Sequence, residues 1–176
     1  PIMLILTDAE EIGLVGAEAF FNQHPLAKEI GIVINIEGSG SSGSSLVLRT
    51  SKNNELLIKS YSGESSSPYG FSFVKEIFKR MPNDTDFSVV NRANIAGIDF
   101  AFAGERNHYH TPSDTVDNID LRTIQHHGEN ILPLSRELAS IGWEDMGDEF
   151  IYGGEIYGVW TQWKSSSSLI LCILSV

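Results

Sequence analysis

The sequence predicts an α/β layered fold in which helices pack against a mostly parallel central sheet. Short continuous apolar runs, which are typical of strands buried inside a parallel sheet, alternate along the chain with segments of helical periodicity. The chain has 176 residues, of which 41% are hydrophobic and 20% are charged. This length and composition suit one domain with a sizeable core, and they argue against a disordered chain.

The first part of the chain alternates strand, helix and strand. Ile2 to Leu6 is a continuous apolar run that predicts a buried strand. Residues 13–23 predict a helix, because Pro25 lies just beyond its end. Residues 31–36 (GIVINI) predict a second buried strand, and the sequence GSGSSGSS that follows predicts a flexible loop.

The second part repeats this alternation and ends in a long helix. We expect a short strand over 46–49, helices over 55–61 and 71–80, a core strand over 98–102, and a helix over 121–138. Pro133 should kink or interrupt the last helix, because proline lacks the backbone N–H. His126 and His127 on this helix are predicted to be surface residues, remote from the strand ends.

The two ends of the chain indicate a fragment of a longer protein. The chain opens with PIMLILTD, an apparent core strand, without an initiator Met or a signal-peptide pattern. It stops within LILCIL, well short of the ~20 apolar residues of a membrane span. All three Trp residues lie in 143–164, where the composition changes. We therefore expect residues 1–141 to belong to one domain and 142–176 to form an aromatic-rich tail.

Charge and cysteine content exclude several classes of function. Asp and Glu number 23 against 12 Lys and Arg, so the formal net charge is −11. A nucleic-acid-binding protein needs a basic face for phosphates, whereas an acidic chain favours cations or metals as partners. Cys172 is the single cysteine, which rules out an internal disulfide framework and a multi-cysteine zinc site. A metal site here must use His, Asp and Glu.

Acidic and histidine residues follow three of the predicted strands. Glu10 and Glu11 follow the first, Glu37 follows the second, and His110 lies a few residues past the third. The carboxyl ends of parallel strands meet at one edge of a sheet, where ligands bind in open α/β folds. Together these side chains offer the oxygen and nitrogen ligands of a cysteine-free zinc site. The alternatives are an acidic first helical turn, a polar loop start and a solvated loop histidine.

Five motifs occur in the same order as in a known enzyme family. They are TDAEEIGLVGA, NIEGSG, NDTDF, GIDFAF and YHTPSDT. The chain is similar over residues 1–141 to the leucyl-aminopeptidase-like dizinc metallopeptidases of clan MH. The sequences of these motifs most resemble those of the membrane-anchored branch, which comprises endoplasmic-reticulum metallopeptidases and vacuolar membrane proteases. The resemblance implies a three-layer α/β/α sandwich that is incomplete at its N-terminal side, so that residues 1–141 are the C-terminal part of a zinc peptidase catalytic domain.

The resemblance also implies a role for each candidate residue. Glu10 would be the general base that takes a proton from the attacking water. Glu11 and His110 would bind one zinc ion, and Glu37 would bind the second. The complete parent protein would hold two zinc ions and act on peptides, most simply as an aminopeptidase. The resemblance also implies that three residues near the site could support the metal ligands from behind, the alternative being plain turn and strand-end roles. They are Thr85, Asp86 and Asp99.

The chain departs from the family pattern upstream of Glu10. The family draws a further His and a metal-bridging Asp from that region, and only nine residues precede Glu10 here. Because catalytic zinc normally takes three protein ligands, we expect the isolated chain to be inactive.

Two other functions remain open on the same scaffold: a glutaminyl cyclase, which is a one-zinc transferase, and a non-catalytic receptor-like binding module. The resemblance further implies a parent protein that is associated with a membrane through segments outside this chain. Its peptidase domain would then lie on the non-cytosolic side. The sequence determines neither the side-chain specificity nor the oligomeric state.

Overall fold

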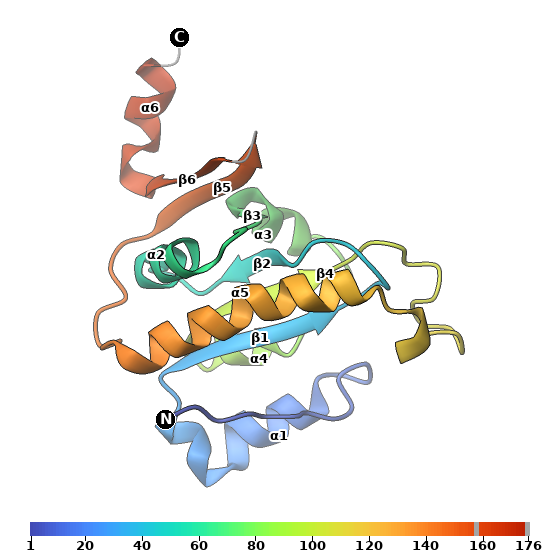
Figure 1. Cartoon of the computed structure of the whole chain (residues 1–176). Helices are drawn as coiled ribbons and strands as arrows, with labels where there is room; N and C mark the ends of the chain where they lie inside the picture. Colours follow the sequence, from blue (N-terminus) through green and yellow to red (C-terminus); the bar gives the residue numbers. More distant parts are fainter. Residues whose placement is uncertain (157–158, 175–176) are drawn as a thin grey trace.

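The computed structural model describes residues 1–156 and 159–174, and it has the predicted α/β class. Tyr157 and Gly158 of the aromatic tail and the last two residues lie outside the described part. The strands are β1 (Ile32–Gly38), β2 (Leu46–Thr50), β3 (Gly70–Phe71), β4 (Ala96–Phe102), β5 (Phe150–Ile156) and β6 (Val159–Lys164). They form one sheet in the order β1-β4-β2-β3-β5-β6 (Figure 1).

The sheet is mixed. β1 pairs in parallel with β4, and β2 pairs in parallel with β3. β2 runs antiparallel to β4, and β5 runs antiparallel to both β3 and β6. The predicted boundary near residue 141 falls just after the last long helix. Beyond it, β5 and β6 continue the sheet through their pairing with β3.

Helices cover both faces of the sheet. The α-helices are α1 (Val15–Gln23), α2 (Glu55–Glu64), α3 (Ser72–Phe78), α4 (Phe87–Arg92), α5 (Leu121–Ser140) and α6 (Ser168–Leu174). Short 3₁₀ turns are η1 (Pro25–Glu29), η2 (Val116–Asn118) and η3 (Ser165–Ser167). Figure 1 shows α5 in front of β1 and β4, with α4 behind them. α2 packs on α5, and α3 packs on β2, which gives the three layers expected.

The central strand β4 separates an apolar face from a polar one. Ile98 and Phe100 are completely buried and pack with Tyr61 of α2 and Leu134 of α5. Asp99, between them in the sequence, points to the opposite face because side chains alternate along a strand. This alternation places the hydrophobic core under α2 and α5 and leaves polar groups on the α4 side.

Helix α5 is continuous over 20 residues, so the predicted interruption at Pro133 is wrong. Asp120 caps its start by accepting a hydrogen bond from the backbone N–H of Arg122 at 2.9 Å. Residues spaced three or four apart are buried against the sheet and α2. They are Thr123, His127, Asn130, Leu134 and Leu138. A long amphipathic face of this kind stabilises the helix enough to tolerate one missing hydrogen bond.

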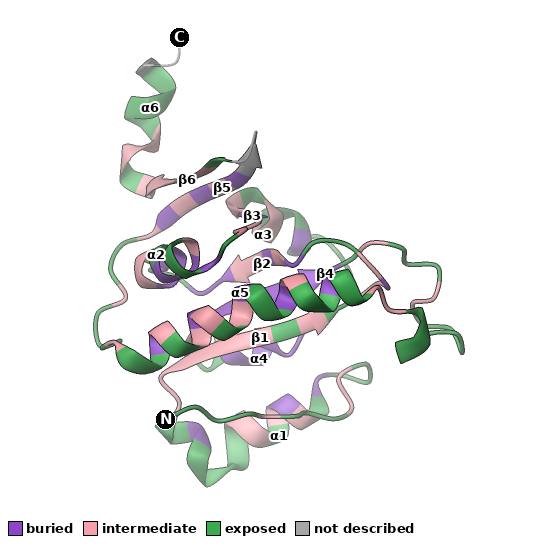
Figure 2. Ribbon diagram, viewed as in Figure 1, coloured by how far each residue is buried: buried purple, intermediate pink, exposed green. Residues whose placement is uncertain are grey.

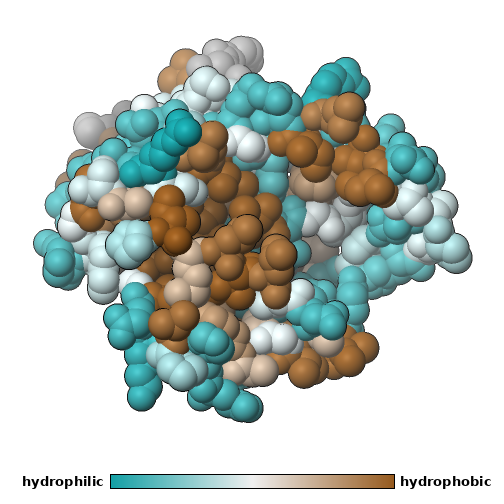
Figure 3. Space-filling view, turned by 60° about the horizontal axis from the view of Figure 1, so that its bottom comes forward, coloured by the Kyte–Doolittle hydropathy of each residue, from teal (hydrophilic) through white to brown (hydrophobic). Residues whose placement is uncertain are grey.

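The predicted strand over Ile2 to Leu6 does not form. The segment is extended, makes no ladder with another strand, and leaves Leu4 and Leu6 at 80% and 88% exposure (Figure 2). An apolar run becomes a buried strand only where a neighbouring strand pairs with it. β1 is accordingly an edge strand, half-buried rather than buried as predicted, and Ile36 on it is 51% exposed. Figure 3, in which the bottom of Figure 1 is turned forward, shows apolar side chains gathered on that face of the molecule.

The aromatic-rich segment ends in a short apolar helix. α6 spans only seven residues, and Leu169, Ile170 and Ile173 are 60–71% exposed. Within residues 1–156 and 159–174, no helix has both the length and the apolar character needed to cross a membrane.

Candidate functional site

The predicted site residues lie at one edge of the sheet. Glu10 and Glu11 lie in the turn before α1, and Glu37 lies near the carboxyl end of β1. His110 lies in the long loop between β4 and α5. Since β1 and β4 are parallel, their carboxyl ends point the same way, and the turn and the loop approach them from either side (Figure 1).

Glu11 and His110 are in direct contact although 99 positions separate them. Nε2 of His110 lies 2.8 Å from Oε1 of Glu11, and both side chains are more than half exposed. The ring of Tyr109 stacks on the His110 ring at 3.8 Å between centroids. His110 also has a positive φ of 57°, which is uncommon for a residue with a side chain and is found often at functional sites.

Glu10, Glu37 and Asp86 concentrate negative charge beside this pair. Burial raises the pKa of Glu37 to about 7, although a hydrogen bond from Asn35 acts to lower it. The neighbouring charges of Asp99, Glu10 and Asp86 raise this pKa as well. The pKa of Glu10 is also raised, first by burial and then by the charges of Glu11 and Asp86. A carboxylate with a raised pKa accepts a proton more readily near neutral pH, as a general base must.

Asp86 is a buried carboxylate close enough to Glu10 and Glu37 to raise the pKa of both. Its side chain is 8% exposed, and Oδ2 accepts a hydrogen bond from the hydroxyl of Thr7 at 2.5 Å. Oδ1 is buried and has no hydrogen-bond partner among the described residues. A buried carboxylate oxygen in this condition is costly, and a cation would relieve the cost.

A polar network behind the carboxylates includes two predicted residues, Thr85 and Asp99. Asp99 is completely buried and accepts hydrogen bonds from Asn35 at 2.9 Å, from Arg49 at 2.9 Å and from Thr85 at 3.0 Å. Burial raises the pKa of Asp99, while the Arg49 guanidinium and the two other donors act in the opposite direction.

Sequence reasoning missed Asn35 and Arg49. Asn35 is a polar residue inside the apolar run GIVINI, and Arg49 directly follows the apolar run Leu46–Leu48; a polar residue within a predicted strand was the available signal. Asn35 and Asp99 are paired across β1 and β4, and Arg49 and Asp99 are paired across β2 and β4. The three side chains therefore form one row across three strands.

The donor types around Glu11 and His110 fit zinc, which accepts carboxylate oxygen and imidazole nitrogen. The unpartnered oxygen of Asp86 and the raised pKa values of Glu10 and Glu37 also favour a cation at this edge. Within the described part of the chain, however, no three His, Cys, Asp or Glu side chains converge closely enough to hold a metal ion. Among the described residues, the structure therefore brings Glu11 and His110 into contact without completing a metal site.

Both histidines of α5 are less exposed than predicted. His127 is 6% exposed, and its Nδ1 lies 2.7 Å from the hydroxyl of Ser45. His126 is half-buried, and its Nδ1 accepts a hydrogen bond from the backbone N–H of Ser45 at 3.1 Å. The two rings thus fix the end of the glycine- and serine-rich loop.

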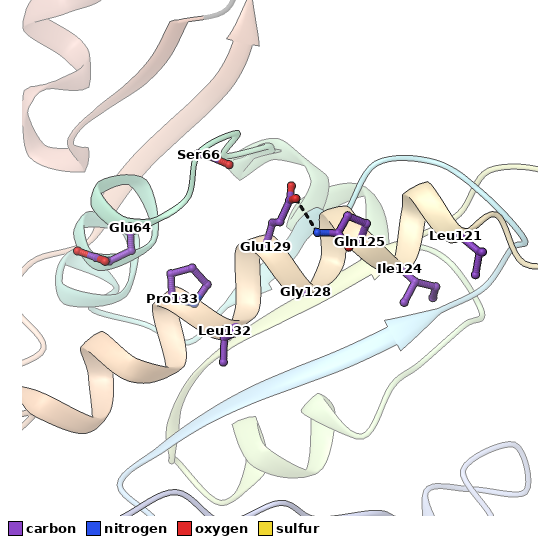
Figure 4. Close-up of a pocket in the computed structure, with 9 residues that line it drawn as sticks. All are labelled: Glu64, Ser66, Leu121, Ile124, Gln125, Gly128, Glu129, Leu132 and Pro133. Carbon is purple, nitrogen blue, oxygen red and sulfur yellow. Dashed lines mark hydrogen bonds between the residues drawn. The ribbon is translucent and has the colours of Figure 1, made fainter.

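A surface hollow of about 800 Å³ lies between the end of α2 and the outer side of α5 (Figure 4). Its lining consists of Glu64, Ser66, Leu121, Ile124, Gln125, Gly128, Glu129, Leu132 and Pro133. Gln125 donates a hydrogen bond to Glu129 there at 2.7 Å. None of the predicted site residues borders this hollow, so it is separate from the candidate metal site.

The sequence was compared with protein families and with individual known proteins. Residues 1–135 match peptidase family M28. The chain is 33% identical over 159 residues to endoplasmic reticulum metallopeptidase 1 of Mus musculus, covering 89% of this chain and 18% of that protein. It is 33% identical over 144 residues to a vacuolar membrane protease of Candida dubliniensis, covering 80% of this chain and 15% of that protein. A vacuolar membrane protease of Eremothecium gossypii is 34% identical over 171 residues, or 94% of this chain and 16% of that protein.

The chain thus spans less than a fifth of the length of these relatives. No solved structure matches it. The family match covers the two glutamates before α1, β1, β4 and the loop with His110, which are the elements that form the acidic edge of the sheet. The chain belongs to peptidase family M28.

Proposed function

We propose that this chain works in a zinc-dependent exopeptidase that releases amino acids from the N-terminus of peptides. The observation that supports this most directly is the contact between Glu11 and His110 beside Glu10, whose pKa is raised. These residues lie within the part of the chain that matches family M28, and similar proteins are named metallopeptidases and proteases.

Each side chain has a distinct task in this proposal. Glu11 and His110 would hold one zinc ion, and Glu37 would hold a second. A zinc ion held there would supply a lowered pKa, of about 7, for a bound water and polarisation of the substrate carbonyl. Glu10 accepts the proton of the attacking water and returns it to the departing amine. Its half-buried position and acidic neighbours favour the protonated form that this return requires.

The acidic edge also supports the choice of an aminopeptidase. The free α-amino group of a peptide is a cation near neutral pH, and the negative charge of Glu10, Glu37 and Asp86 at this edge would attract it.

The donor count implies that other residues complete the metal site. Catalytic zinc normally has three protein ligands, and the described residues offer Glu11 and His110 for one ion. We propose that the remaining ligands lie outside residues 1–176, and that these residues by themselves hold zinc weakly and hydrolyse no peptide. The names of the relatives also support a membrane-associated parent protein. We propose in addition that its peptidase domain lies on the non-cytosolic side.

The test uses the full-length protein that contains this chain, with a leucyl peptide as substrate. Glu10→Gln should retain zinc while kcat falls by about 10²–10⁴-fold, because it removes the general base but no ligand. Glu11→Gln should lose zinc. Glu129→Gln is the control, since it removes the same charge from the exposed side of α5. Loss of zinc from Glu10→Gln but not from Glu11→Gln would show that the two roles are interchanged.

The same preparation distinguishes the other functions on this scaffold. Cyclisation of a peptide with N-terminal Gln, without release of amino acids, would identify a glutaminyl cyclase instead. Binding of zinc without either reaction would favour a non-catalytic module.

A further inference from the structure

Arg49 is a largely buried cation that contacts β4 and the residues around the start of α4. Only 12% of its side chain is exposed. Its Nε donates to Asp99 at 2.9 Å, and its Nη2 donates to the hydroxyl of Thr85 at 2.7 Å. A buried charge is costly unless it is paired and hydrogen-bonded, and the contacts of Arg49 meet both conditions.

Further contacts of Arg49 reach the segment that leads into α4. Its Nη1 donates to the hydroxyl of Ser88 at 3.0 Å, and its Nη2 lies 3.4 Å from the carboxylate of Asp84. The guanidinium also lies over the ring of Phe78, at 4.6 Å from the centroid. The planar fork of arginine can bind several acceptors in fixed directions, which a lysine ammonium cannot do.

These contacts join Arg49 to the candidate site by two routes. Through Asp99, Arg49 is linked to Asn35, whose Nδ2 donates both to Asp99 and, at 3.2 Å, to Glu37. Through Thr85, it holds the segment whose next residue is Asp86, the carboxylate with an unpartnered buried oxygen. Neither route includes a contact between Arg49 and the proposed ligands themselves.

We propose that Arg49 is a positioning residue of the peptidase site, which holds the 84–88 segment against β4 and so fixes Glu37 and Asp86 in place. The inference rests on the proposed function, since it names the residue that orients that site. Partners behind metal ligands commonly contribute 10–100-fold to metal affinity or activity. Arg49 is suited to this role because its fork connects strand β4 and the 84–88 segment at once.

A purely structural role for Arg49 makes a different prediction. If Arg49 only neutralised the buried Asp99, then removal of both charges would restore stability and activity together. A buried ion pair can often be replaced by apolar or neutral groups without loss of stability, whereas removal of one partner is strongly destabilising. If Arg49 orients the 84–88 segment, the double replacement should restore stability alone.

The experiment compares Arg49→Met, Arg49→Lys and the double variant Arg49→Met with Asp99→Asn in the full-length protein. Arg92→Met is the control, because Arg92 is an exposed arginine on α4 that pairs with Glu18. The measurements are the melting temperature, kcat and KM on a leucyl peptide, and zinc affinity by competition with a chelator.

We expect both single variants at Arg49 to lose about 10–100-fold in kcat or zinc affinity, with KM little changed. Arg49→Lys should keep more of the melting temperature than Arg49→Met but should not recover kcat. The double variant should regain the melting temperature without regaining kcat. Unchanged kcat and zinc affinity in Arg49→Met, or recovery of kcat along with stability in the double variant, would overturn the inference.

The readouts keep the two proposals apart. If the unmodified protein binds zinc but hydrolyses no peptide, the proposed function fails. The inference is then judged on zinc affinity, which should still fall about 10–100-fold in Arg49→Met. If the unmodified protein binds no zinc, both proposals are overturned.

Discussion

Replacement of His127 by Gln should remove an acid-sensitive contribution to the stability of the fold. The His127 ring packs edge-on against Phe100 and Phe102, with centroids 6.5 and 5.5 Å apart. Its Nδ1 lies 2.7 Å from the hydroxyl of Ser45, and its Nε2 is buried without a partner among the described residues. Burial, together with the nearby His126, lowers the pKa of His127 to about 4.

The sign of the pH effect follows from this lowered pKa. The native state keeps His127 neutral, whereas the unfolded chain binds a proton near its ordinary pKa of 6.5. The stabilisation is therefore complete above pH 6.5 and is lost as the pH falls toward 4. At about 1.4 kcal/mol per pKa unit, the whole effect is about 3 kcal/mol. The part lost between about pH 7.5 and about pH 5 is about 2 kcal/mol.

Urea unfolding at those two pH values measures this effect. Tryptophan fluorescence is a suitable probe, because Trp160 stacks on the buried ring of Tyr152 in the core. His127→Gln should lower stability at the higher pH and should show a pH dependence smaller by about 2 kcal/mol than the unmodified chain. His24→Gln, at an exposed position, is the control. An equal pH dependence in the unmodified chain and in His127→Gln would refute the reasoning from burial.

Other predictions concern the metal and the core. Zinc binding by the full-length protein should weaken as the pH falls through 7, because the pKa of Glu37 is about 7 and His110 binds zinc only when neutral. Competition with a chelator above and below pH 7 measures this change in zinc affinity. Glu37→Gln should make the zinc affinity depend less on pH. Leu134→Ala should cost about 2–5 kcal/mol in urea unfolding, against about 0.5 kcal/mol or less for Leu132→Ala, because Leu134 is completely buried and Leu132 is 52% exposed. Residues 1–176 expressed alone should show weak zinc binding in the same competition assay and no release of leucine, and tight stoichiometric zinc with full activity would contradict the proposed ligand set.

The sequence was sufficient to predict the elements whose pattern is local. The apolar runs at 31–36 and 98–102 became β1 and β4, and the periodicity of 121–138 became α5. The run from Ile2 to Leu6 has the same local pattern, yet no strand in the described part of the chain pairs with it. Hydrophobicity alone does not say whether a partner is present, so strand pairing was the part that could not be predicted.

The candidate site divides along the same line. Strand-end reasoning placed Glu11 and His110 at one edge of the sheet, and the structure brings them into contact. It missed Arg49, because the link from Arg49 to Asp99 depends on the antiparallel pairing of β2 with β4. That pairing, including the register shift between Val47 and Arg49, has no marker in the sequence of either strand. Long-range register decides which buried polar groups meet, and single-strand patterns do not contain it.

The core and the candidate site depend on the same register. Along β4, Ile98 and Phe100 pack under α2 and α5, whereas Asp99 between them receives Asn35 and Arg49 on the opposite face. Because the side-chain period of a strand is two, a shift by one residue would bury Asp99 in the apolar layer and move Phe100 into the polar network. The energy of the apolar face therefore selects the register that aligns Asn35, Asp99 and Arg49. If Arg49 positions Glu37 and Asp86 as we propose, their placement depends in this way on packing on the far side of the sheet.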